Sequence, residues 1–161
     1  MTLVLKAGLK IDAHQHFWQP LRRDYDWMPQ DNLILNCAYG PPDLGPSLEK
    51  HDIDGTVVVQ AAATVQETEY MLGLADATPS IKGVVGWINF ENPNNLAHLG
   101  RFTAHLKFLG VRPMFQDIPD VNWMLREDIQ WAFRAIIDLD ITFDALGFPK
   151  HLPNFLTLIT R

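Results

Sequence analysis

The stretch IDAHQHFW, residues 11–18, places two histidines two positions apart at the end of an apolar, β-rich run. Successive side chains of a strand point to opposite faces, so Asp12, His14 and His16 are predicted to share one face. Two imidazoles arranged in this way can bind one metal cation, with Asp12 orienting a ring. The alternative is a pair of hydrogen-bonded histidines on a half-buried strand, because a metal normally needs three or more protein ligands.

Further β-rich runs follow along the chain, and several are continuous rather than alternating in hydrophobicity. TVVV at 56–59 and GVVG at 83–86 are examples. Continuous runs are typical of strands buried on both faces, which favours a parallel sheet covered by helices. The predicted strands are 9–14, 56–60, 82–88, 108–112 and 141–146.

The intervals between these runs carry helical patterns, in which apolar residues recur every three or four positions. Two buried helix faces are predicted from this spacing: Leu96, Leu99, Phe102 and Leu106, and then Leu125, Ile129, Ala132 and Ile136. Other helices are expected at 44–53, at 67–77 and from Pro153 onward. The resulting order of strand, helix, strand, helix is typical of an α/β protein.

The number of these units predicts part of a larger fold. A complete (β/α)8 barrel of the TIM type has eight units in at least about 200 residues, whereas 161 residues supply about five units. We therefore expect residues 1–161 to form a single, partial barrel domain that is truncated after about five β/α units. A doubly wound open sheet of five strands fits the same length and stays as the alternative.

Composition excludes several classes of protein. Lys and Arg number 13 against 19 Asp and Glu, which gives a net charge of -6 and argues against a nucleic-acid partner. The single cysteine, Cys37, cannot form an intramolecular disulfide. No apolar run approaches the roughly 20 residues needed to cross a bilayer, and the first residues do not resemble a signal peptide. A cytoplasmic protein with no membrane partner is expected.

Segments spread over essentially the whole chain resemble those of the amidohydrolase-related lactonase family in order and spacing. That family includes fuconolactonase-like sugar-lactone hydrolases and pyrone dicarboxylate lactonases. Besides IDAHQHFW, the matching segments are YDWM (25–28), QA (60–61), ETE (67–69), GVVGWIN (83–89), LGVR (109–112), QD (116–117), FDAL (143–146) and KHLP (150–153).

The resemblance implies a distorted barrel of the amidohydrolase type that opens a cyclic ester, such as a sugar-acid lactone, with water. His14 and His16 match the paired catalytic histidines that face the scissile carbonyl in that family. Family members differ in whether they use a divalent ion, so His14 and His16 are expected either to bind one, with zinc the first candidate, or to act without metal.

Four other residues are predicted to contact the small-molecule substrate. Arg112 follows the fourth strand and could grip a carboxylate or hydroxyls, the alternative being a surface ion pair. Gln116 could hydrogen-bond a hydroxylated ring. Glu67 is a metal ligand, a substrate contact or an acidic residue of a first helical turn. Tyr25, like Trp18, Trp27 and Trp87, could supply an aromatic wall.

No segment of the chain matches the further histidine and the late aspartate that the family carries on its remaining strands. The 161 residues alone are therefore expected to be inactive. Three alternatives stay open at this stage. They are a decarboxylase or amide hydrolase of the wider superfamily, a small metal-binding domain that uses His14 and His16 with Glu67 as a further candidate ligand, and a non-catalytic chain that forms a homo-oligomer through its open sheet edges.

Overall fold

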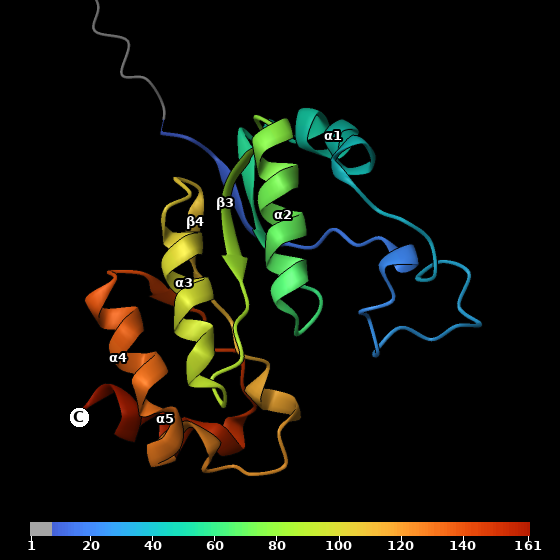
Figure 1. Ribbon diagram of the computed structural model, residues 1–161. Helices are drawn as coiled ribbons and strands as arrows, with labels where there is room; N and C mark the ends of the chain where they lie inside the picture. Colours follow the sequence, from blue (N-terminus) through green and yellow to red (C-terminus); the bar gives the residue numbers. More distant parts are fainter. Residues whose placement is uncertain (1–7) are drawn as a thin grey trace, which may run out of the picture.

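The computed structural model describes residues 8–161 as alternating strands and helices around one parallel sheet (Figure 1). The strands are β1 (Ile11–Gln15), β2 (Gly55–Val59), β3 (Ile81–Gly86), β4 (Phe108–Val111) and β5 (Thr142–Phe143). The helices are α1 (Pro41–Lys50), α2 (Val65–Ala77), α3 (Leu96–Thr103), α4 (Gln130–Asp138) and α5 (Leu152–Ile159).

The strands pair in the order in which they occur along the chain. Each of β1, β2, β3 and β4 is parallel to the next strand, so the sheet order is β1-β2-β3-β4-β5. A doubly wound sheet would reverse its strand order at a switch point, and this sheet does not. The five strands therefore form five consecutive units of a (β/α)8-type barrel, as the sequence predicted.

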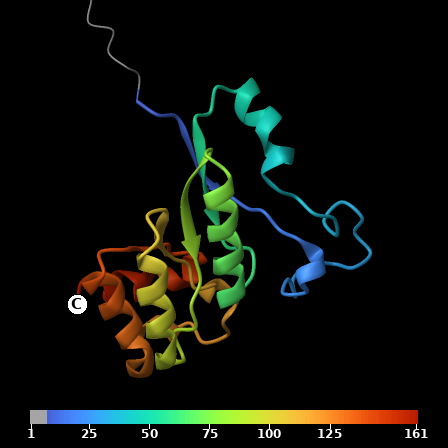
Figure 2. The ribbon, with the colours of Figure 1, turned by 45° about the horizontal axis from the view of Figure 1, so that its top comes forward.

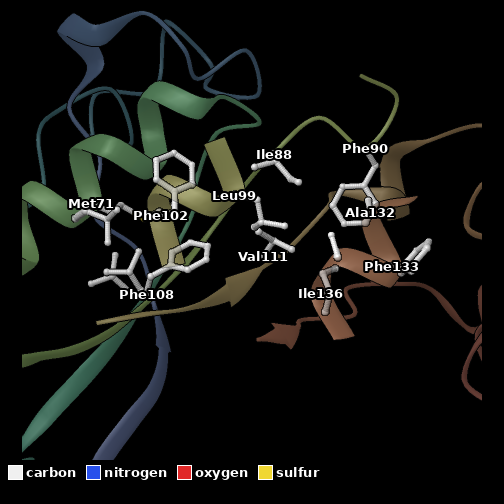
Figure 3. Close-up of a cluster of buried hydrophobic side chains, with 14 of the residues drawn as sticks. Met71, Ile88, Phe90, Leu99, Phe102, Phe108, Val111, Ala132, Phe133 and Ile136 are labelled. Atoms are coloured by element: carbon white, nitrogen blue, oxygen red, sulfur yellow. The ribbon is translucent and has the colours of Figure 1, made fainter. Parts of the chain in front are cut away.

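Helices α2 and α3 cover one face of the sheet, while α1 stands off to one side (Figures 1 and 2). The sheet contributes fully buried side chains to the core, such as Val58, Val84 and Val111. Met71 of α2 and Phe102 of α3 pack near Phe108, and the core continues to Phe133 and Ile136 of α4 (Figure 3). The core thus lies between the strands and the helices that connect them.

Local capping explains where two of the helices begin. Thr64 precedes α2, and its Oγ1 accepts the backbone N–H of Glu67 at 3.0 Å. Gly40 precedes α1, which begins with Pro41, and the backbone N–H of Gly40 donates to Oδ2 of Asp43 at 2.8 Å.

The predicted apolar face of residues 96–106 is only half correct. Leu99 and Phe102 are buried, whereas Leu96 is 49% exposed and Leu106 is 100% exposed. The helix ends at Thr103, because the chain must turn before β4 begins at Phe108. A helical period extended beyond the end of a helix no longer predicts which side chains face the core.

Two further boundaries differ from the sequence predictions. The region expected to be one helix from Leu125 onward contains the 3₁₀ turns 123–125 and 127–129 before α4 begins. Arg126 lies between these turns with an extended ψ of 137°, which interrupts the helix. The fifth strand, expected at 141–146, pairs only over Thr142–Phe143, although the backbone N–H of Asp144 still reaches the Val111 carbonyl at 3.0 Å.

Within residues 8–161, no helix has the length and apolar character needed to cross a membrane. The cytoplasmic location stays a prediction.

Candidate active site

His14 and His16 converge at the carboxyl end of β1. Their Nε2 atoms lie 3.2 Å apart, and their rings meet edge to face with centroids 4.9 Å apart. The register between β1 and β2 shifts between the pairs Asp12–Thr56 and Gln15–Val58, so β1 has one extra residue there. This irregularity was not predicted, whereas the meeting of His14 and His16 agrees with the predicted shared face.

Asp12 does not orient an imidazole ring, in contrast to the sequence prediction. Its Oδ1 accepts the backbone N–H of His14 at 3.1 Å. A shift in strand register disrupts the regular ladder of backbone hydrogen bonds, and the carboxylate supplies a partner for this N–H group.

His16 is held in one tautomer by the neighbouring strand. Its Nδ1 lies 2.7 Å from the carbonyl oxygen of Val59, which can only accept, so Nδ1 carries the hydrogen and Nε2 has a free lone pair in the neutral ring. Burial, together with the positive charge of Arg112, lowers the pKa of His16 from its ordinary value. His16 is therefore neutral near pH 7, as a metal ligand or a proton acceptor must be.

We expect acid to destabilise the chain through His16. Its folded-state pKa lies below the ordinary value of 6.5, so the unfolded state binds more protons as the pH falls through 6.5. The stabilisation is present above that pH and is lost below it. Urea unfolding measures the free energy of unfolding at about pH 7.5 and about pH 5.5. The decrease between these two pH values should be smaller in His16→Gln than in the unmodified chain.

The exposed His51 provides the matched control for this measurement. His51→Gln should retain the pH dependence of the unmodified chain. Equal pH dependences in His16→Gln and His51→Gln would contradict the effect assigned to His16.

Arg112 is a buried cation, not the surface residue of an ion pair. It follows β4 and is 4% exposed. Its Nε and Nη2 donate to Oε1 of Gln60 at 3.2 and 2.5 Å, Nη2 also donates to the Gln60 carbonyl, and Nη1 lies 3.3 Å from Nε2 of His14. The amide of Gln60 in turn donates to the Arg112 carbonyl at 3.0 Å, so the side chain that holds the guanidinium is itself anchored to the end of β4.

The charge of Arg112 has no direct counter-ion in the part of the chain that the structure describes, where no carboxylate oxygen lies within 4.0 Å of it. Burial lowers the pKa of Arg112, and the carboxylate of Asp144 partly offsets this effect. Asp144, which follows β5, also raises the pKa of His16. Its carboxylate therefore acts electrostatically on both Arg112 and His16. Asp144 was not among the predicted site residues, although it lies within the fifth predicted strand, 141–146, and directly follows the observed β5.

A cavity of about 290 Å³ opens beside these groups, lined by His16, Trp18, Trp27, Ala61, Arg112, Met114 and Leu146. Its volume lies near the lower end of the range for ligand pockets and suits a small ring compound. Trp18 and Trp27 form one wall, with ring centroids 6.0 Å apart. Trp87 lines a neighbouring cavity of about 280 Å³.

The other three residues predicted to bind substrate do not line the 290 Å³ cavity. Tyr25 and Glu67 are buried and hydrogen-bond to each other at 3.0 Å. Gln116 lies in a 3₁₀ turn, where its Nε2 donates to Asp117 at 2.7 Å. Substrate contact by these three residues stays a prediction.

The histidine pair fits two positions of a metal site. Nη1 of Arg112 can only donate, so its contact with His14 requires a free lone pair on Nε2 of His14. The Nε2 lone pairs of His14 and His16 then face each other. Two nitrogens about 2.0–2.1 Å from a tetrahedral zinc would lie about 3.3 Å apart, close to the observed 3.2 Å. A cation between them would remove the repulsion between the lone pairs.

A third ligand is not provided by the described residues. Within residues 8–161, no group of three His, Cys, Asp or Glu side chains could hold a metal ion. Glu67 is engaged elsewhere, with Ala61 and Tyr25. The structure therefore does not bring Glu67 to the histidine pair as a third ligand, and metal binding by the pair stays a prediction.

Comparisons with known proteins agree with this architecture. An L-fucono-1,5-lactonase of Burkholderia ambifaria is 39% identical over 152 residues, which are 94% of this chain and 52% of that protein. A crystal structure of an amidohydrolase from Burkholderia multivorans with bound zinc superimposes with a TM-score of 0.86 at 30% identity, covering 95% of this chain and 54% of that one.

A probable 2-pyrone-4,6-dicarboxylic acid hydrolase of Acinetobacter baumannii shares the fold, with a TM-score of 0.70 at 18% identity and with 95% of this chain and 55% of that one covered. The chain thus spans about half the length of the proteins it matches. The family model described as Amidohydrolase matches residues 11–160. By this match over nearly its whole length, the chain belongs to the amidohydrolase family.

Proposed function

We propose that this chain supplies the first half of an active site that opens a small lactone, of the sugar-acid type, with water. The observation that carries the proposal is the buried guanidinium of Arg112, which lies beside His14 at the small cavity and has no carboxylate oxygen of residues 8–161 within 4.0 Å. A buried positive charge of this kind favours an oxygen that becomes negative during the reaction. The resemblance to an L-fucono-1,5-lactonase supports the choice of a lactone.

The reaction assigns a role to each group. Water adds to the lactone carbonyl carbon, the ring C–O bond breaks, and the leaving oxygen takes a proton, which gives a hydroxy acid. Nη1 of Arg112 would donate to an oxygen of the substrate, and the Trp18–Trp27 wall would hold the ring. When no ion is bound, the hydrogen bond from Nη1 of Arg112 would polarise the carbonyl, because Nε2 of both histidines carries a lone pair and cannot donate. In that state, Nε2 of His16 is also a neutral proton acceptor.

The histidine pair would hold a divalent ion, and zinc is the first candidate because imidazole nitrogen is among its preferred ligands. A bound ion would act as a Lewis acid towards the carbonyl and lower the pKa of a bound water. We expect the isolated gene product to contain about one divalent ion per chain and to lose it in His14→Gln and His16→Gln. Metal analysis after dialysis tests this, and equal metal content in the variants and the unmodified protein would contradict it.

The catalytic test uses the natural gene product, whose length is first determined from its intact mass. With a panel of sugar lactones, His14→Gln and His16→Gln should each reduce kcat/KM by about 10²- to 10⁴-fold, because each removes a nitrogen that faces the reacting carbonyl. His51→Gln, at an exposed position, should leave the rate unchanged. Absence of turnover with every lactone, or activity retained in both variants, would overturn the proposal.

Self-association is a separate prediction about the sheet edges. Strands β1 and β5 each have only one neighbouring strand in the described sheet. Exposed edges of this kind can pair with another chain, so a homo-oligomer of the 161-residue chain is expected. Sedimentation of the chain tests it, and a compact monomer would contradict it.

A further inference from the structure

The carboxylate of Glu67 is buried without playing a part in the proposed reaction. Glu67 lies in the first turn of α2 and has 0% exposure. Burial raises its pKa, because an ionised carboxylate is less stable away from water. Buried ionic groups are weak evidence for stability by themselves, so the groups that this carboxylate holds in place must be considered.

Three separate parts of the chain meet at Glu67. Oε1 accepts the backbone N–H of Ala61 at 3.0 Å, just beyond β2. Oε2 accepts the hydroxyl of Tyr25 at 3.0 Å and lies 3.4 Å from Nη2 of Arg22. Tyr25 and Arg22 belong to the long connection between β1 and α1, residues 16–40, which we call the β1–α1 loop. One carboxylate thus links this loop to the end of β2 and to α2.

Additional contacts hold the same part of the loop against α2. Arg22 pairs with Asp24 at 2.5 Å and lies over the ring of Tyr70 at 4.4 Å. Thr64, which caps α2, donates to the same carboxylate of Asp24 at 3.1 Å. The loop is therefore attached to α2 by specific polar contacts around Glu67.

The groups that Glu67 holds are those that build the aromatic wall of the cavity. Ala61 lines the cavity, and its carbonyl accepts Nε1 of Trp27 at 2.6 Å. The ring of Tyr25 contacts that of Trp27 edge to face, with centroids 6.3 Å apart. Trp27 in turn meets Trp18 edge to face. The hydrogen bonds of Glu67 with Ala61 and with Tyr25 therefore each reach Trp27 through one intervening residue.

We propose that Glu67 is a positioning residue, which fixes the β1–α1 loop to the end of β2 and thereby sets the place of Trp18 and Trp27 in the lactone-binding cavity. This inference rests on the proposed function and deepens it, because it assigns substrate affinity to a carboxylate that does not line the cavity. Loss of the Glu67 contacts frees the part of the loop around Arg22 and Tyr25, while His16 keeps its bond to Val59 and Arg112 keeps its bonds to Gln60.

The first test measures loop attachment in this chain and needs no enzymatic activity. Trypsin can cleave after Arg22 and Arg23, which lie within the attached part of the loop. Tyr25→Phe removes the hydroxyl that donates to Glu67, and Glu67→Gln removes the charge that Tyr25 and Arg22 face. Either substitution should increase the cleavage rate at these two sites about tenfold or more, because a hydrogen bond to a charged group is lost from the closed state.

Matched controls separate this effect from a general loss of stability. Tyr70→Phe removes the hydroxyl of another tyrosine near Arg22, and Glu69→Gln neutralises an exposed carboxylate of the same helix. Both should keep the cleavage rate of the unmodified chain. If Glu67→Gln fails to fold, Tyr25→Phe decides the outcome, and equal cleavage of Tyr25→Phe and Tyr70→Phe would overturn the proposal.

The second test measures lactone hydrolysis by the gene product. Tyr25→Phe should raise KM about tenfold and change kcat by less than about threefold, because the wall holds the substrate without joining the chemistry. A fall in kcat at unchanged KM would overturn the positioning role. If the proposed function is wrong, the unmodified protein will not turn over any lactone. The trypsin test does not depend on turnover, so it tests the loop attachment independently.

Discussion

Arg112→Met is expected to reduce kcat/KM for lactone opening by the gene product about 10²- to 10³-fold, the loss typical of removing one donor to a developing negative charge. Nη1 of Arg112 is the guanidinium nitrogen that Gln60 does not engage, and it lies at Nε2 of His14. Methionine has comparable length but no charge and no donor, so it removes this group with little change in packing.

Arg112→Lys should lose nearly as much activity. A lysine cannot reproduce the fork by which Nε and Nη2 engage Gln60, so its ammonium would not keep the position of Nη1. Steady-state kinetics on both variants measures this loss as the change in kcat/KM. Arg134→Met, at an exposed position of α4, is the matched control and should keep full activity. A kcat/KM of Arg112→Met within about threefold of the unmodified protein would contradict the role of Arg112.

Gly110→Ala should lower the free energy of unfolding by about 3 kcal/mol, at the upper end of what overpacking usually costs. Gly110 pairs with Thr142 between β4 and β5, and a Cβ at this position would lie 2.0 Å from the Thr142 carbonyl oxygen. Backbone atoms cannot move aside as a side chain can, so the two strands must separate. Asp144 follows β5 directly, and its electrostatic effect on His16 and Arg112 would weaken with this separation.

Gly73→Ala is the control for this substitution. Gly73 lies on the exposed side of α2, and a Cβ there meets no atom within 4 Å. Alanine in a helix interior is more favourable than glycine by about 0.5–1 kcal/mol, so this variant should be slightly more stable than the unmodified chain. Urea unfolding of both variants measures the difference. Equal stabilities of Gly110→Ala and Gly73→Ala would refute the close approach of β4 and β5.

The sequence predictions were best where burial follows a simple period. The Val-rich runs near Val58 and Val84 are strands buried in a parallel sheet. Arg112 was placed correctly at the end of the fourth strand. Its place near the site could be expected because the carboxyl ends of barrel strands surround the active site. The predictions were poorer at Leu106 and after Phe143, where the chain turns. Periodicity within an element carries no information about where a turn interrupts it.

The roles of charged and polar side chains depended on contacts between distant residues. Glu67 and Tyr25 are 42 positions apart, and Arg112 and His14 are 98 positions apart. Glu67 could be read from the sequence as a ligand, a substrate contact or a residue of a first helical turn. Only the folded chain shows its carboxylate enclosed by Ala61, Tyr25 and Arg22.

The sequence by itself determined the order and type of the elements, the parallel sheet and the histidine pair of β1, whereas the observed strand order separated the partial barrel from a doubly wound sheet. These features arise from hydrophobic period and from neighbouring residues, which a linear sequence displays directly. The tertiary structure alone decided the tautomer of His16, the burial of Arg112 against Gln60, the electrostatic effect of Asp144 and the burial of Glu67. Each of these depends on which polar atoms of remote segments come within hydrogen-bonding or electrostatic range once the sheet has formed, and pairing of that kind leaves no local pattern.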